Sequence, residues 1–128
     1  MITRITIKSE SGYGPLEKAY KDRLTITRDS IRFEYEPLKE MPHNPAVHWT
    51  ETSSDPQFSF MFANLCQEMK KIMSREEEFT GAEHELTTFS IMYDNGKKDE
   101  RTFRISDDEF VLCFTIINQM VKMVHQTP

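Results

Sequence analysis

Cysteine, glycine and tryptophan are scarce in this sequence, and long apolar runs and basic runs are missing. Two cysteines cannot form the disulfide framework that stabilises small secreted domains. No stretch comes near the roughly 20 apolar residues that a membrane-spanning helix needs. No run of Lys or Arg exceeds two residues and the net charge is −5, which argues against broad attraction to nucleic acid or anionic lipid. We therefore expect neither nucleic acid nor a membrane as a partner.

The opening segment, MITRITIKSES, lacks the apolar centre and the small-residue cleavage site of a secretory signal. Cys66 and Cys113 each fall on a predicted apolar helix face, where free thiols of reducing compartments are usually found. A disulfide between them has no support from their spacing. These features predict a cytoplasmic protein.

Recognisable catalytic and metal-binding motifs are missing as well. The four histidines show none of the HExxH, HxH or clustered Cys/His spacings of metal sites. No GxSxG elbow or Ser-x-x-Lys occurs, and the GYGP segment is not followed by the GK[ST] of a phosphate-binding loop. The sequence therefore predicts no cofactor, no metal ion and no catalytic residue, and it favours a non-catalytic protein.

What the sequence does contain is enough apolar material for one core. Apolar residues make up 38% of the chain, and nine Phe and eight Met are among them. A chain of 128 residues is long enough to bury one hydrophobic core but too short for two independent ones. We therefore expect a single domain over residues 1–128.

Alternation of apolar and polar residues predicts five to six strands, largely in hairpins. In the first of them Thr3, Ile5 and Ile7 share the apolar side. The segment Ser11 to Asp22 and the proline-rich segment Pro37 to Pro45 are predicted loops. The predicted strands are Thr3–Lys8, Leu24–Arg28, Ile31–Glu36, Val47–Thr52, Thr88–Tyr93 and Arg101–Ile105, with tight turns at Asp29–Ser30 and Asp94–Lys97.

Two helices are predicted from capping residues followed by apolar stripes. Asp55 and Pro56 are a typical helix start, and apolar residues at helical spacing follow as far as Met73. The segment Ser106–Glu109 reads as a capping box before a second helix over Phe110–Val124. Because this second helix is apolar over more than half of its girth, we expect it to be deeply buried.

The predicted fold is α+β, in the order β-β-β-β-α-β-β-α. Each strand is apolar on one side only, which favours a mainly antiparallel sheet with both helices on its apolar face and its polar face in water. The segments Trp49–Gln67 and Arg101–Gln119, fifty-two residues apart, are similar in sequence. This similarity indicates either an internal β-β-α duplication or convergence on common helix-start chemistry, and both interpretations stay open.

Recognition is the function that the residues favour. Trp49 is the only tryptophan, and Tyr35, His43, His48 and Glu51 are near it in the sequence. Trp and Tyr are enriched at binding hot spots, although a Trp packed in the core is the alternative. We therefore predict a non-catalytic binding or protein-interaction module with these five residues as its surface. Its partner would be another protein, or a second copy bound through a sheet edge or the open sheet face.

Two other functions remain as alternatives. One is a small hydrolase or metal-dependent enzyme that uses His43, His48 and Glu51, which requires a pocket where their pKa values are shifted. The other is an acidic inhibitor that imitates nucleic acid toward a basic partner, with carboxylates at Glu34, Glu36, Glu51 and Glu76–Glu78 at phosphate-like spacing.

Three segments resemble a group of small bacterial α+β proteins with no assigned activity. They are KSESGYGPLEKAYKDRLTITRDSIRFEYEP, HWTETSSDPQF and DEFVLCFTIINQM, which together span most of the chain. The resemblance implies a bacterial, cytosolic, single-domain protein. It transfers no functional residue, because the group has no defined motif.

Overall fold

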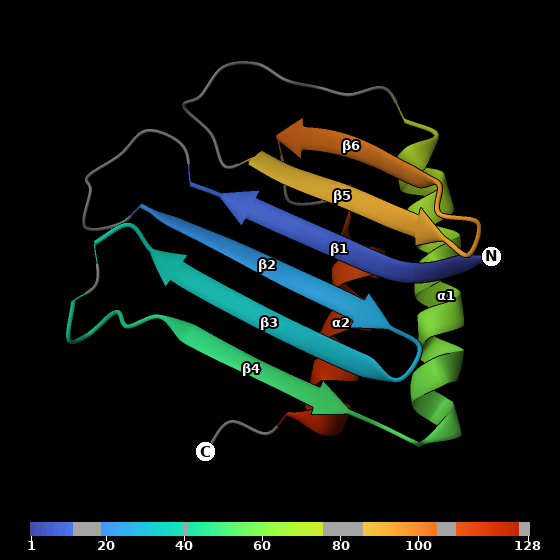
Figure 1. Cartoon of the computed structure of the whole chain (residues 1–128), viewed down its shortest axis with the longest axis horizontal. Coiled ribbons are helices and arrows are strands. Elements are labelled where there is room, and N and C mark those ends of the chain that lie inside the picture. The colour runs from blue at the N-terminus through green and yellow to red at the C-terminus, as the bar shows by residue number, and fades with distance from the viewer. Residues whose placement is uncertain (12–18, 40, 76–85, 105–109, 126–128) are drawn as a thin grey trace.

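The computed structural model describes residues 1–11, 19–39, 41–75, 86–104 and 110–125 (Figure 1). Its elements follow the predicted order β-β-β-β-α-β-β-α. They are β1 (Ile2–Glu10), β2 (Tyr20–Thr27), β3 (Ser30–Pro37), β4 (Val47–Thr52), α1 (Pro56–Met73), β5 (Leu86–Tyr93), β6 (Lys98–Arg104) and α2 (Val111–Val124).

The six strands form one antiparallel sheet in the order β4-β3-β2-β1-β5-β6. Both helices lie behind this sheet in Figure 1, so the opposite face, called the open face below, carries no helix. The predicted α+β fold is therefore confirmed. The hairpins β3–β4 and β5–β6, each of which is followed by a helix, occupy the two ends of the sheet.

Apart from shifts of a few residues at strand ends, such as β6 beginning at Lys98 instead of Arg101, the sheet differs from the prediction at two places. Thr3 is exposed and Ile2 is buried instead, because the register of β1 against β5 shifts between Ile2 and Arg4. Strand β2 begins at Tyr20, inside the segment predicted as a loop, because Lys21 and its neighbours pair with both β1 and β3. Both differences come from pairing with strands that are distant in the sequence, which the alternation of apolar and polar residues within one strand does not predict.

The two helices differ in how they begin and in how deeply they are buried. Asp55 caps α1, and its carboxylate accepts a hydrogen bond from the backbone N–H of Gln57 at 2.9 Å, as its position before Pro56 predicts. The predicted capping box at Ser106–Glu109 lies outside the described residues. The expectation that α2 is deeply buried is wrong, because only three of its residues, Cys113, Ile117 and Met120, are buried.

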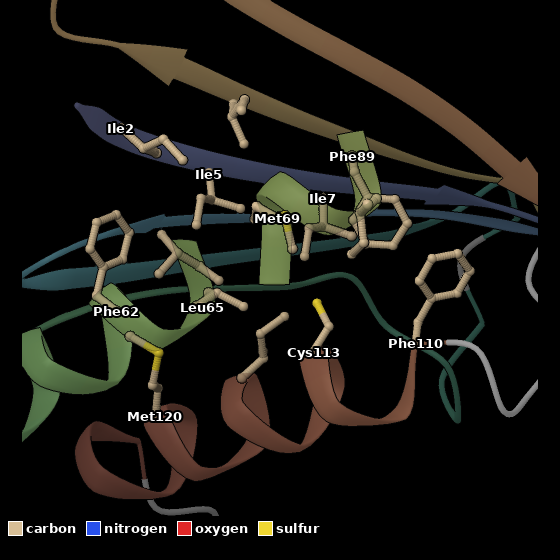
Figure 2. Packing of buried hydrophobic residues seen from close by; sticks show 14 of the residues in the cluster. Ile2, Ile5, Ile7, Phe62, Leu65, Met69, Phe89, Phe110, Cys113 and Met120 are labelled. Atoms are coloured by element: carbon tan, nitrogen blue, oxygen red, sulfur yellow. The ribbon is translucent and has the colours of Figure 1, made fainter. Parts of the chain in front are cut away.

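One apolar core lies between the sheet and the helices. Figure 2 shows side chains of the sheet, among them Ile5 and Phe89, and of the two helices, among them Leu65, Met69 and Met120, in the space between the sheet and α2. A cluster of aromatic rings extends this core toward β6: the ring centroid of Phe89 lies 6.0 Å from that of Phe103, 5.2 Å from that of Phe110 and 6.2 Å from that of Phe114. Neither of the two described helices is long and apolar enough to cross a membrane.

Candidate functional site

Trp49 lies on the helix-facing side of β4, half-buried at the edge of the core. Its ring stacks on the imidazole of His125, with centroids 4.0 Å apart and an interplanar angle of 5°, and it lies 5.8 Å from the ring of Phe33. Nδ1 of His125 is 3.4 Å from Oε1 of Glu51. These contacts join the C-terminal end of α2 to the edge strand, so Trp49 and Glu51 contribute to packing.

The structure divides the other residues of the predicted surface between two faces. The Tyr35 hydroxyl, on the same side of the sheet as Trp49, donates a hydrogen bond to Oδ1 of Asn44 at 2.8 Å. His48 lies on the opposite, open face of β4, because neighbouring residues of a strand point to opposite sides. His43 is exposed in the turn before this strand.

The three residues of the enzymatic alternative are not brought to one pocket among the described residues. His48 and Glu51 are three positions apart on β4 and therefore point to opposite faces. The histidine that does approach Glu51 is His125, which is 74 residues away in the sequence. Because this contact depends on how α2 packs, no local pattern points to it.

One group of side chains on the open face has the donors of a metal site. Ligand atoms of Glu34, Glu36 and His48 all lie within 4.8 Å of one another. Nε2 of His48 is 3.8 Å from Oε1 of Glu36, and Oε1 of Glu34 is 3.2 Å from Nε of Arg32. Arg32 thus already neutralises one of the two carboxylates that a cation would need.

The carboxylates of the acidic-inhibitor alternative are also divided. Glu34 and Glu36 lie on the open face, while Glu51 faces the helix side. Glu76–Glu78 lie outside the described residues, so their spacing relative to the others has no structural test.

Neither cysteine is placed for nucleophilic chemistry. Burial raises the pKa of the Cys66 thiol to about 11 and that of the Cys113 thiol to about 12. Because the thiolate is the nucleophile, such groups are almost entirely protonated near neutral pH. This agrees with the prediction from their positions on apolar helix faces.

The open face has a hollow at its centre, with a cavity volume of about 250 Å³. Its floor consists of three short hydroxyl side chains in one row across three adjacent strands: Thr25 of β2, Thr6 of β1 and Ser90 of β5. Longer side chains surround this row, so the hollow exists because small residues pair with small residues. We call it the open-face hollow.

The rim of the open-face hollow is cationic. Arg4, Lys8, Arg23 and Lys98 line it, and among the described residues no carboxylate does. Lys8 and Arg23 are direct cross-strand partners. In the described part of the chain Arg4, Lys8 and Arg23 form no ion pair, and only Lys98 has a carboxylate partner.

That partner is Glu100, which lies beside the hollow. Its Oε1 accepts a hydrogen bond from the Ser90 hydroxyl at 2.8 Å and lies 3.0 Å from Nζ of Lys98. These two donors, helped by the charge of Lys8, lower the pKa of the Glu100 carboxyl group. Sequence reasoning missed this cluster. Its only sequence signal is the outward polar side of each strand, which says nothing about which strands are neighbours.

Comparison with known proteins gives no match to any family model, to any curated protein or to any solved structure. The sequence and the structure together establish a small α+β single-domain fold.

Proposed function

We propose that this protein is a non-catalytic binding module whose ligand is a small anion held in the open-face hollow. The observation that carries the proposal is the lining of the hollow: Arg4, Lys8, Arg23 and Lys98 converge there with no carboxylate among the described lining residues, although the chain as a whole has a net charge of −5.

Two of the lining cations are close enough to repel each other. Lys8 and Arg23 are directly opposite each other on neighbouring strands, and like charges in that position are destabilising, by up to about 1 kcal/mol judging from cross-strand pairs of opposite charge. Arg23 also has Glu34 as its cross-strand neighbour on β3, yet neither Arg23 nor Lys8 forms an ion pair among the described residues. A bound anion would relieve the repulsion, which supports a binding role for the cluster.

The dimensions of the hollow limit the ligand to a small group. Its volume of about 250 Å³ is below the roughly 300–1,000 Å³ typical of pockets for drug-sized molecules. The donors are guanidinium, ammonium and hydroxyl groups, which together bind oxyanions through charge-assisted hydrogen bonds. The supported ligand is therefore an anionic group of few atoms, free or at the end of a larger molecule.

Calorimetric titration at low ionic strength tests this proposal, with inorganic phosphate, sulfate, citrate and acetate as probes. We expect saturable binding of at least one anion, and a loss of roughly tenfold in affinity in Arg23→Gln, because a hydrogen bond to a charged group contributes about 1.5–3 kcal/mol. Arg32→Gln is the matched control, since Arg32 lies on the same face but pairs with Glu34 outside the hollow. Absence of saturable binding by all four probes, or equal losses in the two variants, would refute the proposal.

Self-association through α2 is a second candidate function, favoured by a separate observation. Val111 and Leu112 are 54% and 55% exposed at the start of this helix, and Lys122 is its only charged residue. Interface centres are depleted of charged residues. In a chain with a net charge of −5, this nearly uncharged helix is a surface where two copies meet without like-charge repulsion, so a second copy is its proposed occupant.

Sedimentation equilibrium tests this second candidate over a range of protein concentrations. We expect a concentration-dependent dimer that Leu112→Glu disrupts and Phe60→Glu does not, because Phe60 is 61% exposed on α1 instead. A monomer at all concentrations would exclude the second copy as the occupant. The resemblance to uncharacterised bacterial proteins adds no residue to either proposal.

A further inference from the structure

We infer that the open-face hollow binds a phosphate group and that Glu100 is an internal competitor for the same donors. The inference rests on the proposed anion-binding function and adds two things to it: the class of the ligand and the residue that sets its affinity.

Glu100 is already bound as an oxyanion of a ligand would be. One of its carboxylate oxygens accepts from the hydroxyl of Ser90, which belongs to the floor, and lies beside the ammonium group of Lys98, which belongs to the rim. A floor residue, Ser90, and a rim residue, Lys98, therefore already bind the same anionic oxygen, Oε1 of Glu100. An incoming anion has to share or replace these two donors.

The donors that Glu100 leaves free match a tetrahedral dianion better than a flat carboxylate. The hydroxyls of Thr6 and Thr25 lie in the floor, and the cations of Arg4, Lys8 and Arg23 surround them. Donors at two levels can reach oxygens that point in several directions, as those of phosphate do, whereas a carboxylate presents two oxygens in one plane and one guanidinium satisfies it. None of these three cations forms an ion pair among the described residues, and together they carry more positive charge than a single negative charge neutralises.

Glu100→Gln tests the competition directly. The variant keeps the size of the side chain and removes its charge, so it frees the Lys98 ammonium group and removes a negative charge from the edge of the site. We expect inorganic phosphate to bind roughly fivefold more tightly, the effect of one unit charge a few ångströms away in water. This expected gain in phosphate affinity cannot result from a damaged fold, because a damaged fold would weaken binding.

Asp99→Asn is the matched control for net charge. Asp99 is the neighbour of Glu100 on β6 and points to the other face, where the hydroxyl of Tyr93 contacts it at 3.4 Å. The Asp99→Asn substitution removes the same unit charge at the adjacent position, on a side chain that lies outside the hollow. An affinity gain in Glu100→Gln that Asp99→Asn reproduces would overturn the competitor role, while anion binding itself would stand.

Titration of the unaltered protein with three probes tests the ligand class. Inorganic phosphate and glycerol phosphate should bind at least tenfold more tightly than acetate, and the tighter of the two phosphates identifies the source as free phosphate or a phosphate ester. Acetate binding as tight as phosphate would overturn the assignment to phosphate and leave the general anion site intact. Binding of none of these anions, nor of sulfate or citrate, would refute the proposed function itself.

Discussion

Removing one hydroxyl of the buried Ser9–Thr87 pair should destabilise the protein more than removing both. These residues face each other on β1 and β5, with Oγ of Ser9 3.1 Å from Oγ1 of Thr87, and their side chains are 9% and 0% exposed. A hydrogen bond between two neutral groups contributes about 0.5–1.5 kcal/mol net, whereas a buried hydroxyl left without a partner costs about 1–3 kcal/mol. Ser9→Ala should therefore cost about 2 kcal/mol.

The two single variants should differ from each other and from the double variant. Thr87→Val should cost about 1 kcal/mol, because the Ser9 hydroxyl that remains is near enough to the surface to reach water. The double variant Ser9→Ala/Thr87→Val leaves no unpaired polar group, so its loss should stay below about 1 kcal/mol. The coupling energy of the cycle is then about 2 kcal/mol or more, in the range seen for residues in contact.

Urea unfolding followed by the fluorescence of Trp49, the only tryptophan, measures these differences. With a slope of about 2 kcal/mol per molar urea, Ser9→Ala should lower the midpoint by about 1 M. Thr88→Val is the matched control, because Oγ1 of Thr88 is 2.9 Å from Oγ1 of Thr102 in a similar cross-strand pair that is only partly buried. Strictly additive losses in the double variant would show that the reasoning about unpaired hydroxyls is wrong.

Three further predictions concern the helix cap, the tight turn and the thiols. Asp55→Ala should cost about 1 kcal/mol in thermal unfolding, because the N–H of Gln57 loses its acceptor, and Asp55→Asn should restore most of it. Gly96→Ala should cost about 1–2 kcal/mol through backbone strain alone, since φ is +85° and no atom lies within 4 Å of an added Cβ; an unchanged urea midpoint would contradict this. Folding raises the pKa of Cys66 to about 11 and of Cys113 to about 12, so the stability that these thiols contribute below pH about 8.5 should be lost as the pH rises toward those values. Urea midpoints measured against pH should show this loss in the natural sequence and not in a variant with alanine at both cysteines.

Much of the fold could be predicted because its signals are local. Asp55 and Pro56 mark a helix start through their own backbone chemistry, and the turn that contains Gly96 needs a residue that adopts positive φ. The orientation of Thr3 and the start of β2 at Tyr20 could not be predicted in this way, because both depend on pairing with strands that are distant in the sequence. Deep burial of α2 was expected because apolar residues surround more than half of the helix. A helix is buried only where other elements cover it, and the sheet and α1 cover α2 on one side only.

The candidate site shows the same division more sharply. The sequence by itself determined that Thr6 and Lys8 share the polar side of their strand, since side chains of a strand alternate between two faces. Only the tertiary structure decided that Arg4 and Lys98, 94 positions apart, would line one hollow with Arg23, in a chain whose overall charge is negative. The physical reason is that strand order is set by hydrogen bonds and core packing between distant segments, and the polar face takes whatever charges those strands carry.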